Sequence, residues 1–221
     1  MVEALKKKIY YWDLYYKNIK KKFFYLNPSP FARFFKKKYL NKSVNLLEIG
    51  CGNGRDTFFF NNKVNSIVAL DSSAEAINKN KKIAKINKLK IKFINKNFEN
   101  FNYNKIKVIN SIYARFFLHT INEKQENILI KIFKIISKKK LGSIFAMEFR
   151  TTKDSLIKTG KKISNNERYT DHYRRFIDVK KFQNKLKINN FKIIYLRVGV
   201  NLSKTRSENP HLCRIVFKNA E

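Results

Sequence analysis

The chain has little of several residue types, and each scarcity limits what the protein can be. Its 221 residues include only two cysteines, Cys51 and Cys213, so the sequence predicts no disulfide framework and favours a reducing cytoplasm. No hydrophobic run approaches the roughly 20 residues that a helix needs to span a bilayer. Residues 1–8 are charged and lead into aromatics and lysines, which argues against a secretory signal. We therefore expect a cytoplasmic protein without a membrane span.

Acidic residues are also scarce. There are 16 Asp and Glu against 49 Lys and Arg, which gives a net charge of +33. Such a balance is compatible with nucleic-acid binding, because Lys and Arg neutralise phosphates and release counterions. The excess is nearly all lysine, however, and lies along the whole chain beside many asparagines and isoleucines, as in proteins of AT-rich genomes. Nucleic acid is therefore a possible partner that the sequence does not favour, and no feature of it predicts an oligomeric state.

Arginine is rare by comparison, so its positions carry more information. Four of the ten arginines fall within residues 150–175, namely Arg150, Arg168, Arg174 and Arg175. The guanidinium group suits bidentate binding of phosphate or carboxylate. This concentration predicts a site for a small anionic substrate. The alternative is a surface segment whose arginines pair with Glu167, Asp171 and Asp178.

The order of apolar and polar segments predicts an α/β fold. From Val44 onward, short apolar runs alternate with amphipathic segments, the pattern of βαβ units around a parallel sheet. Strands are expected at 45–49, 66–70, 90–94, 107–113, 143–149, 191–198 and 212–218, and helices at 55–61, 74–87, 123–137 and 179–188. In the second of these helices, Ile77 and Ile86 are expected on one buried face. The length suits one domain of about 100–200 residues with some insertions.

Residues 1–43 differ in composition from the rest of the chain, because they are rich in basic and aromatic residues. Pro28 and Pro30 interrupt them, so we expect one or two helices that break there. These residues are interpreted as an N-terminal helical lid in which Tyr15 could reach the substrate, although the aromatics could instead pack on the sheet. Residues 44–221 would form the main domain, with a substrate-binding insertion at about 151–177 that shows no clear period.

Three of the six glycines stand at alternate positions directly after the first apolar run: Gly50, Gly52 and Gly54. Glycine permits positive φ and lets a ligand lie against the backbone. The spacing is G-x-G-x-G, unlike the G-x-G-x-x-G of dinucleotide-binding folds, and Glu48 precedes it. An ordinary glycine-rich turn is the alternative. The pattern resembles the first motif of the class I S-adenosylmethionine-dependent methyltransferases.

This resemblance implies a seven-stranded, mostly parallel Rossmann-like sheet with helices on both faces and an antiparallel last strand. It also implies S-adenosyl-L-methionine as cofactor, bound at the carboxyl ends of the strands. Asp71, which ends the second strand, would accept hydrogen bonds from the ribose hydroxyls, or else cap the next helix. Asn97 stands where the family commonly has an acidic residue that contacts the adenine amino group. The implied cofactor-binding residues are Glu48, Gly50, Cys51, Gly52, Asn53, Gly54, Arg55, Asp71, Ser72, Asn97, Phe98 and Ala114.

The end of the fourth strand lacks the Asn/Asp-Pro-Pro-Tyr/Phe motif of related amino-methylating enzymes and offers Arg115 and His119 instead. A cation and a group that titrates near neutral pH suit an oxygen nucleophile on an anionic molecule. If the acceptor is a hydroxyl, His119 or His172 is the candidate base; a phosphate-type oxygen needs none, and His119 could simply be structural. The predicted substrate-binding residues are Tyr15, Arg115, Glu148, Arg150, Tyr169, Tyr173 and Arg174. The histidines are isolated, which predicts no metal site.

Within the family, the segments Tyr113–His119 and His172–Arg175 are similar to those of small bacterial enzymes that modify surface polysaccharides, such as capsules. The sequence is therefore interpreted as that of an O-methyltransferase. Its substrate would be a small metabolite that carries phosphate or phosphoramidate and is linked to a sugar or nucleotide. An RNA methyltransferase and a non-catalytic cofactor-binding scaffold are the alternatives. The intact glycines and Asp71 argue against the scaffold.

Overall fold

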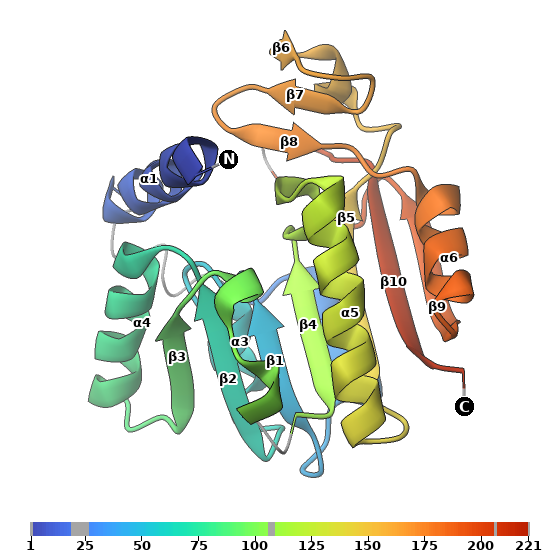
Figure 1. The fold of residues 1–221 in the computed structure, drawn as a ribbon. Coiled ribbons are helices and arrows are strands. Elements are labelled where there is room, and N and C mark those ends of the chain that lie inside the picture. Colours follow the sequence, from blue (N-terminus) through green and yellow to red (C-terminus); the bar gives the residue numbers. More distant parts are fainter. Residues whose placement is uncertain (1, 19–26, 106–108, 206, 221) are drawn as a thin grey trace. The chain divides into compact units, whose positions relative to one another are not determined.

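The computed structural model describes residues 2–18, 27–105, 109–205 and 207–220. They form two compact units, Met1–Phe101 and Asn102–Glu221, which we call the N-terminal and the C-terminal unit. The strands belong to a seven-stranded sheet of order β3-β2-β1-β4-β5-β10-β9 and to a separate three-stranded sheet (Figure 1). Among the described residues, no helix combines the length and apolar character needed to cross a membrane.

The N-terminal unit contributes three parallel strands: β1 (Asn45–Ile49), β2 (Ser66–Asp71) and β3 (Ile91–Asn95). Every residue of β1 is buried, as expected for a parallel strand that is covered on both faces. Burial of each large aliphatic side chain, such as Leu46 or Leu47, contributes about 1.5–3 kcal/mol. The strand ranges predicted from the sequence agree with these to within one residue.

Four helices belong to this unit: α1 (Val2–Asn18), α2 (Pro30–Tyr39), α3 (Arg55–Phe60) and α4 (Ala74–Ile86). The predicted break at the prolines is confirmed, because α2 begins at Pro30 and Ser29 caps it by accepting the Ala32 N–H at 3.0 Å. Ser29 also donates to the buried Asp56 carboxylate at 2.7 Å, which ties α2 to α3. The expectation for Ile86 is wrong, since its side chain is 78% exposed. Nine residues after Ile77, it lies half a turn away on the opposite face of the helix.

The C-terminal unit contributes β4 (Ser111–Arg115), β5 (Ile144–Arg150), β9 (Phe191–Gly199) and β10 (Leu212–Asn219). β4 and β5 are parallel, whereas β10 runs antiparallel to both of its neighbours. The predicted antiparallel last strand is therefore confirmed. The strand expected at 107–113 begins four residues later and ends two residues later as β4, and residues 107 and 108 are outside the described part.

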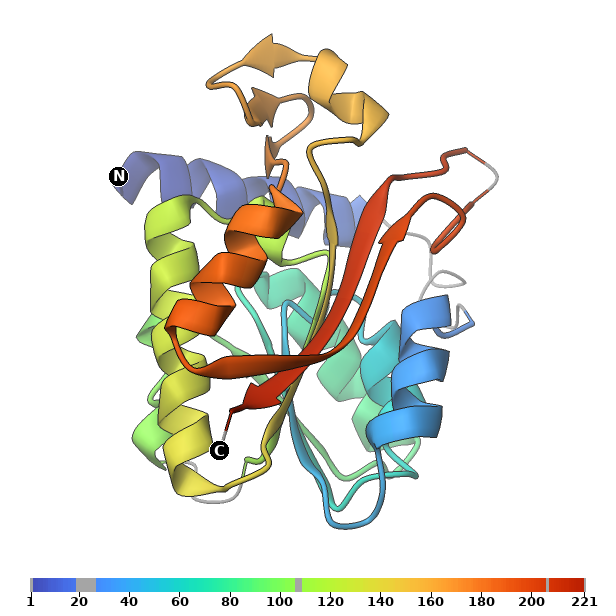
Figure 2. The same cartoon turned by 90° about the vertical axis from the view of Figure 1, so that its right-hand side faces the viewer.

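Two long helices, α5 (Glu123–Lys139) and α6 (Val179–Ile188), lie on the same face of these strands (Figure 2). The ring of Phe133 in α5 lies 4.9 Å from that of Phe145, and the ring of Phe182 in α6 lies 5.4 Å from that of Phe149. Phe145 and Phe149 are four residues apart on β5 and so point to one face of the sheet. These aromatic contacts hold both helices against the core.

The insertion has more regular structure than its sequence predicts. It contains the 3-10 helix η5 (Ser155–Lys158) and a three-stranded antiparallel sheet of β6 (Lys161–Lys162), β7 (Glu167–Tyr169) and β8 (Tyr173–Arg175). Figure 1 shows this small sheet beyond the carboxyl end of β5. Strands of two or three residues are too short for an alternating pattern to be read from sequence. Three more 3-10 turns follow β3 and β4: η2 (Phe98–Asn100), η3 (Tyr103–Lys105) and η4 (Leu118–Thr120).

Candidate active site

The glycine turn after β1 has the conformation that its sequence suggests. Gly52 and Gly54 have φ of 50° and 72°, and a Cβ on Gly54 would lie 2.8 Å from the Phe58 ring. A Cβ on Gly52 would lie 2.2 Å from the hydroxyl of Tyr16. Both positions therefore require glycine, for conformation and for space. The free thiol of Cys51, buried within this turn, has a pKa raised by burial and by the Asp71 carboxylate.

Asp71 connects this turn to the end of β2. Its carboxylate accepts the N–H of Gly52 at 2.8 Å and the N–H of Ser73 at 2.9 Å. The helix cap of α4 is Ser73, which accepts the Ala76 N–H at 3.2 Å, so capping does not account for Asp71. The two amides fix the orientation of a carboxylate that can accept about four hydrogen bonds.

Glu48 lies beneath the turn and is buried in β1. Its Oε2 accepts the hydroxyl of Thr57 at 2.6 Å, which links β1 to α3. Burial, followed by the nearby Asp56 carboxylate, raises the pKa of Glu48 well above its usual value. The side chain thus contacts the start of α3 and stabilises the helix that follows the glycines.

Several other residues predicted to bind the cofactor have local partners. Asn53 accepts the Arg55 N–H at 3.3 Å, and Asn97 accepts the Glu99 N–H at 3.2 Å as the cap of η2. Phe98 is buried. The remaining candidates are Ser72, whose carbonyl accepts the Asn95 amide at 2.9 Å, and Ala114, which is fully buried in β4 of the C-terminal unit.

Helix α1 contacts the glycine turn through a residue that the sequence did not single out. The hydroxyl of Tyr16 lies over Gly52, and burial and the Asp71 carboxylate raise the pKa of Tyr16. Asp13 fixes the helix by accepting the Ser73 hydroxyl at 2.6 Å and the Glu75 N–H at 3.2 Å. Tyr15, the predicted substrate contact, is 46% exposed.

In the C-terminal unit, His119 follows β4 and is 4% exposed. Its Nδ1 accepts the backbone N–H of Arg150 at 3.3 Å, so the neutral ring carries its proton on Nε2. Burial lowers the pKa of His119 well below its usual value, and the positive charges of Arg150, His172, Arg174 and Arg115 lower it further. At neutral pH, His119 is therefore a hydrogen-bond donor through Nε2, near arginines that are paired with carboxylates.

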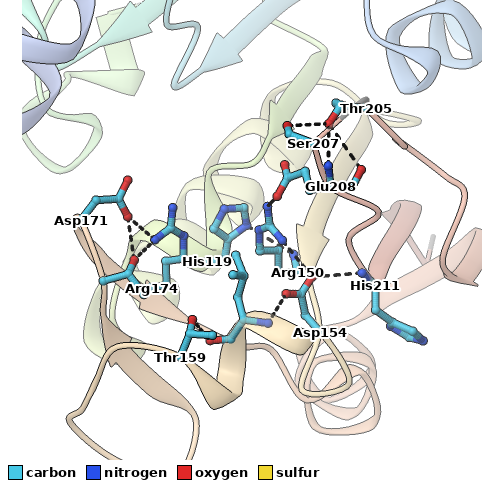
Figure 3. A network of polar contacts seen from close by, with 12 residues as sticks. His119, Arg150, Asp154, Thr159, Asp171, Arg174, Thr205, Ser207, Glu208 and His211 are labelled. Carbon is cyan, nitrogen blue, oxygen red and sulfur yellow. Dashed lines mark hydrogen bonds and ion pairs between the residues drawn. The ribbon is translucent and has the colours of Figure 1, made fainter.

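Arg150, at the end of β5, has a carboxylate on each side of its guanidinium group. Nη1 donates to Asp154 at 2.9 Å and Nη2 to Glu208 at 2.6 Å (Figure 3). Figure 3 shows His119 close to this ion-paired arginine, while the ring of His211 points away. Bidentate or doubly paired guanidinium groups are held in a fixed orientation.

Glu148 is fully buried between two arginines. Its carboxylate accepts Nε of Arg115 at 2.8 Å and Nε of Arg214 at 2.6 Å, and also the Ser203 hydroxyl at 3.0 Å. The guanidinium carbon of Arg115 in turn lies 4.0 Å from the ring centre of Phe116, which has a φ of 54°. Glu148 thus orients Arg115 from inside the unit.

The insertion forms its own polar contacts. Asp171 accepts Nη1 of Arg174 at 2.5 Å and lies 3.2 Å from Nδ1 of His172. Tyr173 donates to Glu167 at 2.5 Å, and Tyr169 is 48% exposed. The alternative, in which arginines of the insertion pair with nearby carboxylates, therefore applies to Asp171, which pairs with Arg174. Glu167 instead accepts a hydrogen bond from Tyr173. Arg168 donates to backbone carbonyls and Arg175 to Glu126.

Residues outside the predicted set also shape these sites. Asn80 of α4 donates to the carbonyl of Gly52 at 2.8 Å, and Asp154 and Glu208 bind Arg150. The one sequence signal for Asp13 and Tyr16 is their three-residue spacing, which places them on one helix face.

Within the described residues, no group of three His, Cys, Asp or Glu could hold a metal ion.

Comparison with known proteins gives a family. A family model described as a methyltransferase domain matches residues 40–193. No curated protein sequence matches the chain. The structure is similar to an S-adenosylmethionine-dependent methyltransferase from Clostridium acetobutylicum, with 17% identity, 98% of each chain covered and a TM-score of 0.65.

Two further solved structures agree. A methyltransferase of the same kind from Methanosarcina mazei has 18% identity and a TM-score of 0.71 over 88% of this chain and 99% of that one. Another, from Anabaena variabilis, has 18% identity and a TM-score of 0.67 over 98% and 94% of the two chains. The family match spans well over half of the sequence, and the chain therefore belongs to the methyltransferase domain family.

Proposed function

We propose that the enzyme methylates an oxygen atom of a small anionic metabolite in the cytoplasm. The metabolite would carry phosphate or phosphoramidate, linked to a sugar or nucleotide. The observation that carries this proposal is the setting of His119: a buried imidazole, with Nε2 as a donor, near Arg150 and Arg174, each of which is ion-paired with a partly exposed carboxylate. An imidazole donor and guanidinium groups together suit the oxygens of a bound anion. The surface-polysaccharide pathway rests on the sequence resemblance of the His119 and His172 segments.

The glycine turn fits the cofactor. Gly52 is left-handed, a conformation that favours glycine, and Asp71 is held at the end of β2 by two backbone amides. We assign Gly50, Gly52 and Gly54 to the backbone face against which the cofactor lies, and Asp71 to its ribose hydroxyls. When bound, the cofactor supplies an electrophilic methyl group. Glu48 supports the turn through Thr57.

On the acceptor side, the residues mainly orient the substrate. His119 has a lowered pKa, so it is poorly suited to take a proton from a hydroxyl. An oxygen that is already ionised at neutral pH needs no base, and His119 would donate a hydrogen bond to it from Nε2. Arg150 and Arg174 would orient the anion. Such alignment can lower a barrier by about 7–11 kcal/mol in the best cases.

The cofactor assignment is tested by calorimetric titration with S-adenosylmethionine and its demethylated product. We expect micromolar binding that Asp71→Asn weakens at least tenfold. Asparagine is preferred to alanine because its carbonyl can replace one of the two amide contacts of Asp71. Asp178→Asn is the matched control, since Asp178 also accepts a backbone N–H, from Lys181 at 3.1 Å. Unchanged affinity in Asp71→Asn would overturn the assignment.

The acceptor is tested with a panel of phosphorylated sugars, nucleotide-linked sugars, neutral sugars and RNA. We expect methylation of phosphate-bearing members. His119→Gln, which retains a donor, should keep more activity than His119→Leu. Equal loss in both variants, or methylation of neutral hydroxyls alone, would contradict the proposal.

An RNA methyltransferase is the second candidate. It is favoured by the exposed lysines of the insertion, Lys153, Lys158, Lys161 and Lys162. If it is correct, RNA is methylated and its binding weakens steeply with salt, by about 10³-fold or more between 50 and 200 mM. A folded protein that binds the cofactor and methylates no member of the panel would point to the scaffold.

A further inference from the structure

The two carboxylates on Arg150 differ in how firmly they are held. Asp154 is 1% exposed and has further partners, because it accepts the N–H of Leu156 at 3.0 Å and the N–H of His211 at 3.0 Å. Its carboxylate is thus part of the backbone network of the C-terminal unit. Removal of Asp154 would leave two partly buried amides without this acceptor, so we regard it as a permanent partner of Arg150.

Glu208 is held differently. It lies in the connection between β9 and β10, and its side chain is 39% exposed. A local turn presents it: the Glu208 N–H donates to the Thr205 hydroxyl at 3.1 Å, and the Thr205 N–H donates to the Glu208 carbonyl at 2.8 Å (Figure 3). Its carboxylate contacts Nη2 of Arg150 at 2.6 Å and can move into water if that one contact is replaced.

A second anionic partner stabilises the buried guanidinium group of Arg150. Its side chain is 7% exposed, and a buried guanidinium without a partner on one edge is costly. The Nη2 edge, which Glu208 contacts, matches carboxylate or phosphate oxygens. An incoming anion could replace Glu208 with the net charge around Arg150 conserved, whereas replacement of Asp154 would break the backbone network.

We propose that the Nη2 edge of Arg150 is an anion-binding subsite, which Glu208 occupies until a phosphate or carboxylate group of a ligand displaces it. Glu208 is then an internal competitor of the substrate. The identification of this anion as part of the methyl acceptor rests on the proposed function, but anion binding at Arg150 does not.

The test is calorimetric titration of the full chain with pyrophosphate and, as a separate arm, succinate. Glu208→Gln removes the competing charge and should tighten binding about three- to fivefold, as expected from the loss of a partly exposed ion pair. Tighter binding of pyrophosphate would identify the ligand group as phosphate, and tighter binding of succinate would identify it as carboxylate. In an Arg150→Lys background, Glu208→Gln should have no effect, because the fork that both anions share is gone. Thermal melts check that each variant is folded.

Glu123→Gln is the matched control, since Glu123 also contacts a cation of the same unit, Lys185, at 3.4 Å. Equal tightening in Glu123→Gln would indicate a general charge effect and overturn the proposal, as would unchanged or weaker binding in Glu208→Gln. If Arg150→Lys does not fold, Glu208→Ala compared with Glu208→Gln decides the same point. Failure to find an acceptor, with the anion-binding difference intact, would reject the proposed function and leave the subsite standing.

Discussion

Glu48 illustrates how a single buried carboxyl group links the active site to stability. Its pKa is raised by burial and by Asp56, while its Oε2 binds the Thr57 hydroxyl. Above the usual value of 4.5, the folded protein therefore holds a proton that the unfolded chain has lost. Over this window the free energy of unfolding falls as pH rises.

We predict that Glu48→Gln stabilises the protein at pH 8 and not at pH 4.5. Glutamine can still accept the Thr57 hydroxyl and has no proton to lose. Because loss of the proton from the buried carboxyl group destabilises the fold, the free energy of unfolding in urea should be higher in the variant at pH 8. Glu123→Gln, at an exposed site, controls for the loss of one charge. A gain that is the same at both pH values would contradict this explanation.

At the scale of elements, contacts with α4 hold α1. Asp13 binds the start of α4, and the Lys79 ammonium donates to the Tyr16 carbonyl at 2.5 Å. A carboxylate near the N-terminus of a helix is favourable because of the helix dipole. These contacts hold Tyr16 over Gly52, so the lid that the sequence predicts is linked to the glycine turn through α4.

We predict that Asp13→Ala loosens α1 without unfolding the core. The cost should be about 0.5–1 kcal/mol, the range for a charge at a helix terminus. Amide exchange in α1 should accelerate, and the emission of Trp12, the single tryptophan, should shift to the red. Lys17→Ala, at an exposed position of α1, should change neither. Unchanged exchange in Asp13→Ala would show that Asp13 does not hold the helix.

At the scale of the whole molecule, the net charge of +33 dominates. Positive charges spread over a surface repel one another and destabilise the compact state. The ion pairs that involve Glu148, Asp154 and Glu126 are largely buried, so salt screens them little. Screening should therefore remove more repulsion than attraction.

We predict that the Tm rises by several degrees between 20 and 300 mM sodium chloride, measured by differential scanning calorimetry. Choline chloride at equal ionic strength should give the same rise, which separates screening from cation binding. A Tm that falls with salt would mean that exposed ion pairs outweigh the repulsion.

The sequence by itself predicted most strand and helix ranges, the glycine turn and the acidic residue at the end of β2. These features depend on local rules: the period of apolar residues, the caps, and the φ that only glycine adopts readily. The rules failed for short elements such as β7 and at the last turn of α4, where Ile86 is exposed. The family could be predicted from local rules because the residues of its glycine motif, Gly50 to Gly54, lie next to one another in the sequence.

Only the tertiary structure decided what the charged residues bind. Glu148 pairs with Arg214, 66 residues away, and Arg150 with Glu208, 58 residues away. The proton position on His119 depends on an amide 31 residues further along the chain. A side chain's partner and burial set its charge state and orientation, and segments far apart in the sequence supply both. For that reason a list of arginines and histidines could suggest an anionic substrate but could not show which carboxylates these arginines contact in the fold.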